Sequence, residues 1–516
     1  MITMNEAPST CQTEMTTWHK PRRFGARLGG LLALALLVWG TAALAGAVDQ
    51  VQGLPKAGLL LQEGGKAVIS YNPDLPLAPA STMKVLTALA AIDTWGRHHR
   101  FETEFYQDGQ GTLWVKGLAD PYLVSEEFDL IAQGLKAAGV TRVNGIGLDD
   151  TYFDQDVEIA GRSSTDNPYD APVTALAANF NTVNVVKSGG SVTSAESQTP
   201  LTETARRFGQ QGGAGTQRVN LKQRPIAVGY CGELLGVKLA AAGIQVSGGQ
   251  RLGPVPGGAR LVYRHQNSRT LADMLVPTLK YSNNFVANSL FLRMADPRGQ
   301  GRVSVAAAQR AMTDFARRKF QWTDFRIEDG AGLSRDNRLS ARQLVAVMQS
   351  FAPNRDLMPT QEGNPNVRAK TGTLTGVSSY AGYVRRGGAW EPFALLINQP
   401  VDGGLRRRVA SELVRDASRS TLRSTAEVTN PNDRPVAGSA HAIWPAAPLC
   451  PNAAGDTPRP MPRRCDCPSS PATRRPSVRL DGMPSSGSGS VQRMRPVASA
   501  RTFGSHSPPV LWRSAW

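Results

Sequence analysis

Apolar and polar residues alternate with two different periods along residues 48–421. Residues 82–96 form a nearly continuous apolar run of about four turns, which predicts a buried helix rather than an amphipathic one. Residues 271–294 carry apolar side chains at three- and four-residue intervals, and residues 340–351 follow a similar pattern. Both segments are therefore predicted to be helical.

Strand-like patterns are clearest towards the end of this part of the chain. Residues 377–384 and 390–398 read as two strands, and Arg-Arg-Gly-Gly at 385–388 between them is typical of a hairpin turn. Shorter extended runs at 112–116 and 143–148 lie in a glycine-rich region. This mixture of helices and strands, with an antiparallel pair near its end, predicts an α/β or α+β fold.

Both ends of the chain differ from this globular part. Residues 28–47 form an uncharged run rich in Leu and Ala that follows a basic cluster and ends in small residues. The segment 1–47 is therefore predicted to be a signal peptide or, because the run is long enough to span a bilayer, a retained membrane anchor. In either case the bulk of the chain is expected to be delivered outside the cytoplasm.

The C-terminal segment 422–516 has a composition of its own. It holds 15 of the 35 prolines, many serines and no lysine. Such a segment buries too little apolar surface to offset its ordering entropy, so it is predicted to be a disordered tail. Cys465 and Cys467 lie in it, but metal sites normally have two-residue spacers and further ligands nearby.

Charge and rare residues exclude several classes of function. The chain has 58 Lys and Arg against 41 Asp and Glu, a net charge of +17, but no cluster of basic residues interleaved with aromatics, so no nucleic-acid partner is predicted. Cys231 stands alone and is predicted to be a buried apolar residue. His98, His99 and His265 have neither HxxH nor CxxC around them, so neither a metal nor a cofactor is expected. The same histidines lack a G-x-S-x-G setting, which leaves lysine as the better candidate base.

Lysine is scarce, and one lysine lies in a suggestive position. Ser81-Thr82-Met83-Lys84 is an S-x-x-K sequence at the start of the first predicted helix. Positions i and i+3 share a helix face, so the Lys84 amine can reach the Ser81 oxygen. A lysine in a dry site can have its pKa lowered and act as a base. Taken alone, the pattern also fits a helix cap followed by a surface lysine.

Two further motifs strengthen the functional interpretation. Lys370-Thr371-Gly372, followed by Thr373, precedes the predicted strand at 377–384, where a strand edge would offer a cation, a hydroxyl and a backbone N–H to an anionic substrate. Residues 280–284, Lys-Tyr-Ser-Asn-Asn, contain both an S-x-N pattern, Ser282 to Asn284, and a Y-x-N pattern, Tyr281 to Asn283. Either pattern would supply a hydroxyl and an amide in a serine enzyme that uses a lysine base.

With these motifs the chain resembles the D-alanyl-D-alanine carboxypeptidase/endopeptidase family, the low-molecular-mass class C penicillin-binding proteins. The resemblance runs from about residue 50 to 420 and includes four longer segments: NPYDAPVTALAANFNTVNV at 167–185, SNNFVANSLF at 282–291, DGAGLSRDNRLSARQL at 329–344 and KTGTLTGVSSYAGYV at 370–384. It implies that the second motif is S-x-N.

The resemblance also implies an architecture. The expected fold is a penicillin-recognising serine transpeptidase or β-lactamase-like domain, a sheet flanked by helices, with smaller inserted domains. Ser81 and Ser282 are 201 residues apart, which leaves room for the insertion. The catalytic domain is predicted at 48–99 and 261–421, and the inserted domains at 100–260.

The family's residue roles, carried over, describe a serine DD-peptidase acting on peptidoglycan peptides. Ser81 would attack the carbonyl of the penultimate D-Ala, Lys84 would accept its proton, Ser282 would relay a proton to the leaving group and Asn284 would orient the substrate amide. Lys370 and Thr371 would face the terminal carboxylate, and Gly372 would allow close backbone approach. The backbone N–H groups of Ser81 and Thr373 would form the oxyanion hole. Asp166 or Asp170 would meet the diaminopimelic side chain.

Two other functions stay open at this point. A β-lactamase or esterase on the same scaffold would need fast deacylation, and the chain has no class A-style glutamate motif to activate water. A non-catalytic wall-binding protein would not need Ser81, Lys84, Ser282, Asn284 and Lys370 together. The expected inhibitors of the DD-peptidase are β-lactam antibiotics.

Overall fold

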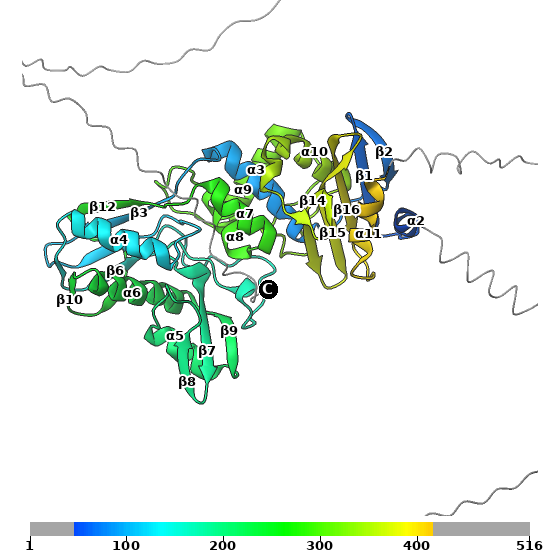
Figure 1. Ribbon diagram of the computed structural model, residues 1–516. Helices are drawn as coiled ribbons and strands as arrows, with labels where there is room; N and C mark the ends of the chain where they lie inside the picture. Colours follow the sequence, from blue (N-terminus) through cyan, green and yellow to red (C-terminus); the bar gives the residue numbers. More distant parts are fainter. Residues whose placement is uncertain (1–45, 416–516) are drawn as a thin grey trace, which may run out of the picture. The chain divides into compact units, whose positions relative to one another are not determined.

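The computed structural model describes residues 46–415 (Figure 1). The predicted leader at 1–47 lies outside this range except for its last two residues, and the predicted tail at 422–516, with Cys465 and Cys467, lies entirely outside it. Within residues 46–415 no helix is long and apolar enough to cross a membrane.

A six-stranded antiparallel sheet packs against the segment that contains Ser81. Its strand order is β13-β14-β15-β16-β1-β2, so the first strand, β1, pairs with the last, β16, and β2 lies at the edge of the sheet beside β1. The strands are β1 (Ala57–Glu63), β2 (Lys66–Tyr71), β13 (Thr360–Gln361), β14 (Asn364–Leu374), β15 (Val377–Arg386) and β16 (Ala389–Ile397). The predicted hairpin is confirmed, with Gly387 and Gly388 at positive φ in its turn.

Alternate residues of this sheet bury opposite faces. Leu59 and Leu61 pack with one set of helices and Leu60 with the other, as the two-residue period of a strand requires. The first face is covered by α2 (Ala47–Gln52) and α11 (Leu405–Leu413). The second face meets the larger helical core of α3 (Met83–Trp95), α7 (Leu271–Tyr281), α8 (Asn284–Arg293), α9 (Val305–Phe320) and α10 (Ala341–Phe351), which is followed by the 3₁₀ helix η4 (Ala352–Leu357).

The sequence predicted α3 and α10 well and the intervening helical segment less well. Helix α3 is buried along its first nine residues, which confirms the buried helix expected at 82–96. The segment 271–294 is not one helix, because Ser282 adopts a left-handed conformation (φ 59°) and Asn283 caps a new helix by accepting a hydrogen bond from the Val286 N–H at 3.1 Å. The break places Ser282 and Asn284 at a junction between two helices.

Besides the short two-stranded pair of β5 and β10, residues 102–266 form two further sheets (Figure 1). A five-stranded sheet, in the order β11-β6-β4-β3-β12, packs with α4 and α6, and a three-stranded sheet, in the order β8-β7-β9, packs with α5. The elements are β3 (Glu102–Gln107), β4 (Leu113–Lys116), α4 (Ser125–Ala137), β5 (Arg142–Val143), β6 (Ile146–Asp149), η2 (Pro168–Asp170), η3 (Asn179–Asn181), β7 (Thr182–Ser188), β8 (Ser191–Ser194), α5 (Glu203–Gln211), β9 (Gly215–Asn220), α6 (Arg224–Ala241), β10 (Gln245–Val246), β11 (Gln250–Leu252) and β12 (Arg260–Gln266).

Two details of this region differ from the sequence interpretation. The extended run predicted at 143–148 is two strands, since β5 pairs with β10 whereas β6 pairs with β4 and β11. The pairing of β12 with β3 carries the five-stranded sheet to Gln266, six residues past the predicted end of the insertion at 260. Cys231 is fully buried in α6, as predicted.

Candidate active site

The first motif lies where a strained turn enters a buried helix. Ala80 has a left-handed backbone (φ 47°), and the 3₁₀ helix η1 (Ala80–Thr82) leads directly into α3. The Pro79 carbonyl accepts hydrogen bonds from the hydroxyls of Thr82 (2.7 Å) and Ser379 (2.6 Å), which tie the turn to β15. A non-glycine residue in this conformation persists only when its surroundings impose it, and such residues cluster at functional sites.

Lys84 lies beneath Ser81 with its amine fully enclosed. Its Nζ donates hydrogen bonds to Ser81 Oγ (2.9 Å), Asn284 Oδ1 (2.8 Å) and the Ala331 carbonyl (2.8 Å). Burial lowers the pKa of Lys84 to about 7, and the negative charge of Asp329 opposes this shift. The amine is therefore positioned to exchange a proton with the Ser81 hydroxyl near neutral pH.

Asn284, from the second motif, connects Lys84 to the inserted region. While its Oδ1 accepts from Lys84, its Nδ2 donates to the Tyr169 carbonyl at 3.0 Å. Ser282 follows the last residue of α7, two positions before Asn284. It lines the same cleft as Ser81. Ser81, Lys84, Ser282 and Asn284 are thus brought together from segments about 200 residues apart.

The third motif lies within a strand of its own, β14, which precedes the strand predicted at 377–384. A Cβ added to Gly372 would lie 2.1 Å from Ser379 Oγ and 2.9 Å from the Ser81 backbone nitrogen. Only glycine therefore allows β14 to lie this close to Ser81. Thr373, the next residue, is exposed and lines the cleft.

Lys370 is almost completely buried near Lys84. Its side chain is 1% exposed, and its Nζ donates to the Thr371 carbonyl at 2.8 Å. Burial and the nearby charges of Lys84 and Arg406 hold its pKa well below the usual value. Lys370, Thr371 and Gly372 are not among the residues that line the cleft.

A buried loop that the motif analysis missed closes the bottom of the site. Asp329 is fully buried, and its carboxylate accepts hydrogen bonds from the N–H groups of Ala331, Leu333 and Ser334, all at 3.0 Å, and from Asn337 Nδ2 at 2.7 Å. This arrangement holds the Ala331 carbonyl against Lys84. The only sequence signal was the resemblance of residues 329–344 as a segment.

These groups open onto a cleft of about 710 Å³. Its lining combines the motifs, the inserted region and the loop after Asp329: Ser81, Gly161, Ser163, Tyr169, Asp170, Tyr281, Ser282, Asn284, Leu333, Ser334, Arg335, Asp336, Thr373, Leu374 and Thr375. Arg335 Nη2 donates to the Thr375 carbonyl at 2.7 Å, so the loop and the β14 end are joined along one wall.

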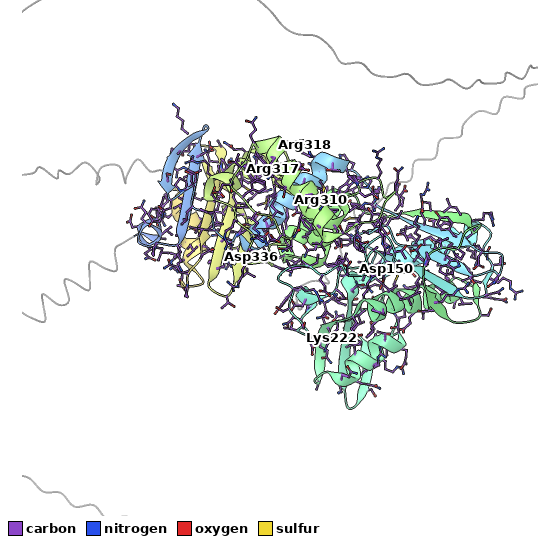
Figure 2. The ribbon with its side chains drawn as sticks, turned by 180° about the vertical axis from the view of Figure 1, so that it is seen from behind. Asp150, Lys222, Arg310, Arg317, Arg318 and Asp336 are labelled. Carbon is purple, nitrogen blue, oxygen red and sulfur yellow. The ribbon has the colours of Figure 1, made fainter. Side chains whose placement is uncertain are left out.

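The structure separates the two aspartates considered for the diaminopimelic side chain. Asp166 is not among the lining residues, and its carboxylate forms an exposed ion pair with Lys222, which Figure 2 shows well apart from the cleft residue Asp336. Asp170 lines the cleft and is 2% exposed, with its carboxylate accepting hydrogen bonds from the Ser163 N–H (3.2 Å) and the Thr165 hydroxyl. Asp170 therefore lies at the cleft and Asp166 does not, and a contact with the diaminopimelic side chain stays a prediction.

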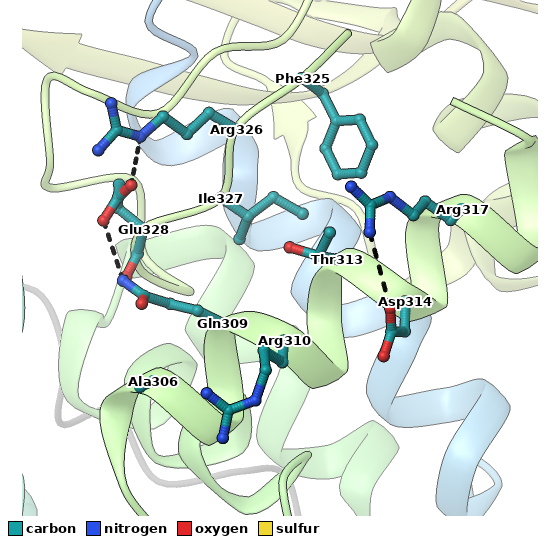
Figure 3. A pocket seen from close by; sticks show the side chains of 10 residues that line it. All are labelled: Ala306, Gln309, Arg310, Thr313, Asp314, Arg317, Phe325, Arg326, Ile327 and Glu328. Atoms are coloured by element: carbon teal, nitrogen blue, oxygen red, sulfur yellow. Dashed lines mark hydrogen bonds and ion pairs between the residues drawn. The ribbon is translucent and has the colours of Figure 1, made fainter. Parts of the chain in front are cut away.

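Another cavity, of about 440 Å³, lies on the outer side of α9 (Figure 3). Arg310 and Arg317 project from α9, and Arg317 pairs with Asp314 at 4.0 Å. None of the motif residues lines it. Within residues 46–415 no group of three or more His, Cys, Asp or Glu side chains is placed to hold a metal ion.

Comparisons with known proteins agree with this geometry. A family model described as the D-Ala-D-Ala carboxypeptidase 3 (S13) family matches residues 49–228, 226–365 and 354–419. Over 396 residues the chain is 27% identical to a D-alanyl-D-alanine carboxypeptidase of Actinomadura sp. strain R39. This alignment covers 62% of this chain and 73% of that protein. Over 389 residues it is 25% identical to the D-alanyl-D-alanine carboxypeptidase DacB of Haemophilus influenzae. This alignment covers 61% of this chain and 79% of that protein.

Solved structures share the fold. The crystal structure of penicillin binding protein 4 from Haemophilus influenzae superposes with a TM-score of 0.59 at 22% identity, covering 72% of this chain and 99% of that one. A second crystal structure of that protein, complexed with a novel β-lactam, gives a TM-score of 0.55. The predicted architecture, an α+β penicillin-binding protein fold, is confirmed.

Proposed function

Because the chain belongs to the D-Ala-D-Ala carboxypeptidase 3 (S13) family, as its motifs indicated, we propose that it is a serine DD-peptidase. The proposed reaction hydrolyses the D-alanyl-D-alanine bond of peptidoglycan peptides, or the equivalent cross-link bond, through an acyl-enzyme on Ser81. The observation that carries this proposal is the 2.9 Å hydrogen bond between Lys84 Nζ and Ser81 Oγ, made by a lysine whose pKa is about 7.

Acylation begins with the neutral Lys84 amine. It takes the proton of Ser81 Oγ as the oxygen bonds to the carbonyl carbon of the penultimate D-Ala. The negative charge on the carbonyl oxygen is stabilised by the backbone N–H groups of Ser81 and Thr373. The close approach of β14 to Ser81, which Gly372 permits, supports this pairing of donors.

The leaving amine then receives a proton, and the carbon–nitrogen bond breaks. Ser282 lines the cleft beside Asn284 and is the proposed relay from Lys84 to that nitrogen. In the second half of the reaction a water oxygen bonds to the acyl carbon while Lys84 accepts its proton. The bond from that carbon to Ser81 Oγ then breaks, and Lys84 returns the proton to Oγ. A β-lactam acylates the same serine, but its leaving group stays attached, so the adduct persists. The β-lactam complex of the Haemophilus influenzae protein supports this sensitivity.

Labelling of the full-length protein with a fluorescent penicillin tests the proposal. We expect a stable adduct that mass spectrometry maps to Ser81 and that Ser81→Ala abolishes. A folded protein that forms no adduct would favour a wall-binding protein, and rapid β-lactam turnover without a trapped adduct would favour a β-lactamase. Hydrolysis of D-Ala-D-Ala peptides, measured alongside, establishes the peptidase activity itself.

The site of action is a separate proposal. Peptidoglycan lies outside the cytoplasm, and the apolar run at 28–47 is suited to export. We therefore propose a periplasmic enzyme, either released by signal cleavage or anchored through that run. Cell fractionation and the N-terminal sequence of the mature protein distinguish these two forms, and recovery of an uncleaved chain from the cytosol would contradict both.

A further inference from the structure

Arg406, in α11, reaches the strand that lines the candidate cleft. Its Nη1 donates hydrogen bonds to the Gly372 carbonyl at 2.8 Å and to Thr373 Oγ1 at 2.7 Å. Its Nε is buried and has no hydrogen-bond partner within residues 46–415, and Arg406 forms no ion pair with any carboxylate in that range. A cation that is partly buried without a counter-ion indicates that an anionic group completes the site.

The lysine of the third motif does not supply an accessible charge at this point. Lys370 is 1% exposed, bonded to the Thr371 carbonyl and absent from the cleft lining. Burial also opposes its protonation. The guanidinium of Arg406, in contrast, stays protonated at any working pH. Arg406 therefore provides a permanent positive charge next to Gly372 and Thr373, whereas Arg335, another cation near this strand, bonds to the Thr375 carbonyl farther along.

A small cavity of about 240 Å³ beside Arg406 shares two lining residues with the main cleft. Thr373 and Leu374 line both spaces, and Arg406 and Val401 line the smaller one. A ligand group at Thr373 is thus within reach of the guanidinium. Because the Thr373 oxygen already accepts from Arg406, its own O–H is free to donate to that ligand.

We propose that Arg406 is a substrate-binding residue that, together with the Thr373 hydroxyl, binds the free carboxylate of the D-amino acid that leaves on acylation. The proposal rests on the DD-peptidase function and assigns its carboxylate specificity to a residue of α11 that lies outside the three motifs. A planar guanidinium suits a carboxylate because it can present two parallel N–H donors.

Two matched thioesters provide the test with the full-length protein. Both carry the same acyl-D-alanyl group; one leaving group is thioglycolate, with a free carboxylate, and the other is its neutral amide. The readout is the ratio of kcat/KM for the two substrates. Arg406→Gln should lower this ratio by about 10- to 100-fold, the effect of losing a charge-assisted hydrogen bond. Arg406→Lys, which keeps the charge but not the planar fork, should lower it less.

Arg407→Gln is the matched control, because Arg407 is exposed on the same helix and touches neither cavity. Its ratio should equal that of the wild type. An unchanged ratio in Arg406→Gln would overturn the proposal, even if both rates fell together. Should that variant not fold, Thr373→Val must lower the same ratio, or the proposal is wrong. A wild-type protein that hydrolyses neither thioester and binds no penicillin would overturn the DD-peptidase function itself.

Discussion

The side-chain nitrogen of Asn284 donates a 3.0 Å hydrogen bond to the Tyr169 carbonyl. Because the oxygen of the same amide accepts from Lys84 Nζ at 2.8 Å, one side chain joins the inserted region to the candidate base. The orientation of the amide is determined by these two partners, since a flipped amide would set its nitrogen against an ammonium and its oxygen against a carbonyl.

Replacing Asn284 by Asp tests this relationship. The new carboxylate would lie beside Lys84 Nζ and favour its charged form, so the pKa of Lys84 should rise from about 7. The rate of penicillin acylation at pH 7 should fall about tenfold or more, since each unit of pKa removes about tenfold of the neutral amine.

Asn283→Asp is the matched control for that variant. It adds the same charge one residue away, and Asp caps a helix as well as Asn does, so α8 should keep its cap. Acylation at pH 7 should stay near the wild-type rate. Equal losses in the two variants would contradict a specific role for the Asn284 amide.

The acylation rate of the wild-type protein should depend on pH through Lys84. Because burial lowers the pKa of this amine to about 7, its neutral form is scarce below pH 6 and predominates above pH 8. The second-order rate constant for penicillin acylation should therefore rise through about pH 7 and then level off. Lys84→Met should remove acylation while leaving the Ser81 hydroxyl in place. A pH-independent rate would show that another group accepts the proton.

A methyl group at Gly372 should separate β14 from the turn that carries Ser81. The added Cβ would lie 2.1 Å from Ser379 Oγ and 2.8 Å from the Pro79 carbonyl, so Gly372→Ala forces a shift where the oxyanion hole is proposed. We expect a destabilisation of about 1–3 kcal/mol, typical of overpacking, and a larger relative loss of acylation. Chemical denaturation and penicillin labelling measure the two effects. Gly109→Ala, where a Cβ meets nothing within 4 Å, is the control and should change neither.

Replacing each aspartate by Asn should show which of Asp170 and Asp166 contacts the diaminopimelic side chain of the substrate. Asp170 lines the cleft, so Asp170→Asn should lower kcat/KM for diaminopimelate-containing stem peptides much more than it slows acylation by a small penicillin. Asp166→Asn removes only an exposed ion pair with Lys222, an interaction that contributes about 0–1 kcal/mol, and should leave peptide hydrolysis near the wild-type rate. The opposite order of effects would restore Asp166 as the substrate contact.

Local patterns in the sequence were sufficient for several elements. The buried helix α3 was predictable from its apolar run, and so was the hairpin of β15 and β16 from alternating residues around a double glycine. The proximity of Ser81 and Lys84 also follows from sequence, because residues three apart on a helix share a face. These relationships are local, so the backbone period alone determines them.

The break between α7 and α8 shows where local patterns failed. The apolar spacing continues through 271–294, but Ser282 turns left-handed and Asn283 begins a new helix. Residues 282–284 are Ser and Asn, residue types that often cap helices. Whether a cap interrupts a helix depends on the packing of both halves, and periodicity does not contain that information.

Only the tertiary structure decided the electrostatic character of the site. The low pKa of Lys84 arises from burial by segments far away in sequence, including Asn284 and the loop of Asp329. The position of Asp170 at the cleft and the approach of Arg406 to β14 depend in the same way on contacts between distant elements. A sequence motif determines which chemical groups are present. Desolvation and charge depend on what packs around those groups, and that is a property of the folded chain.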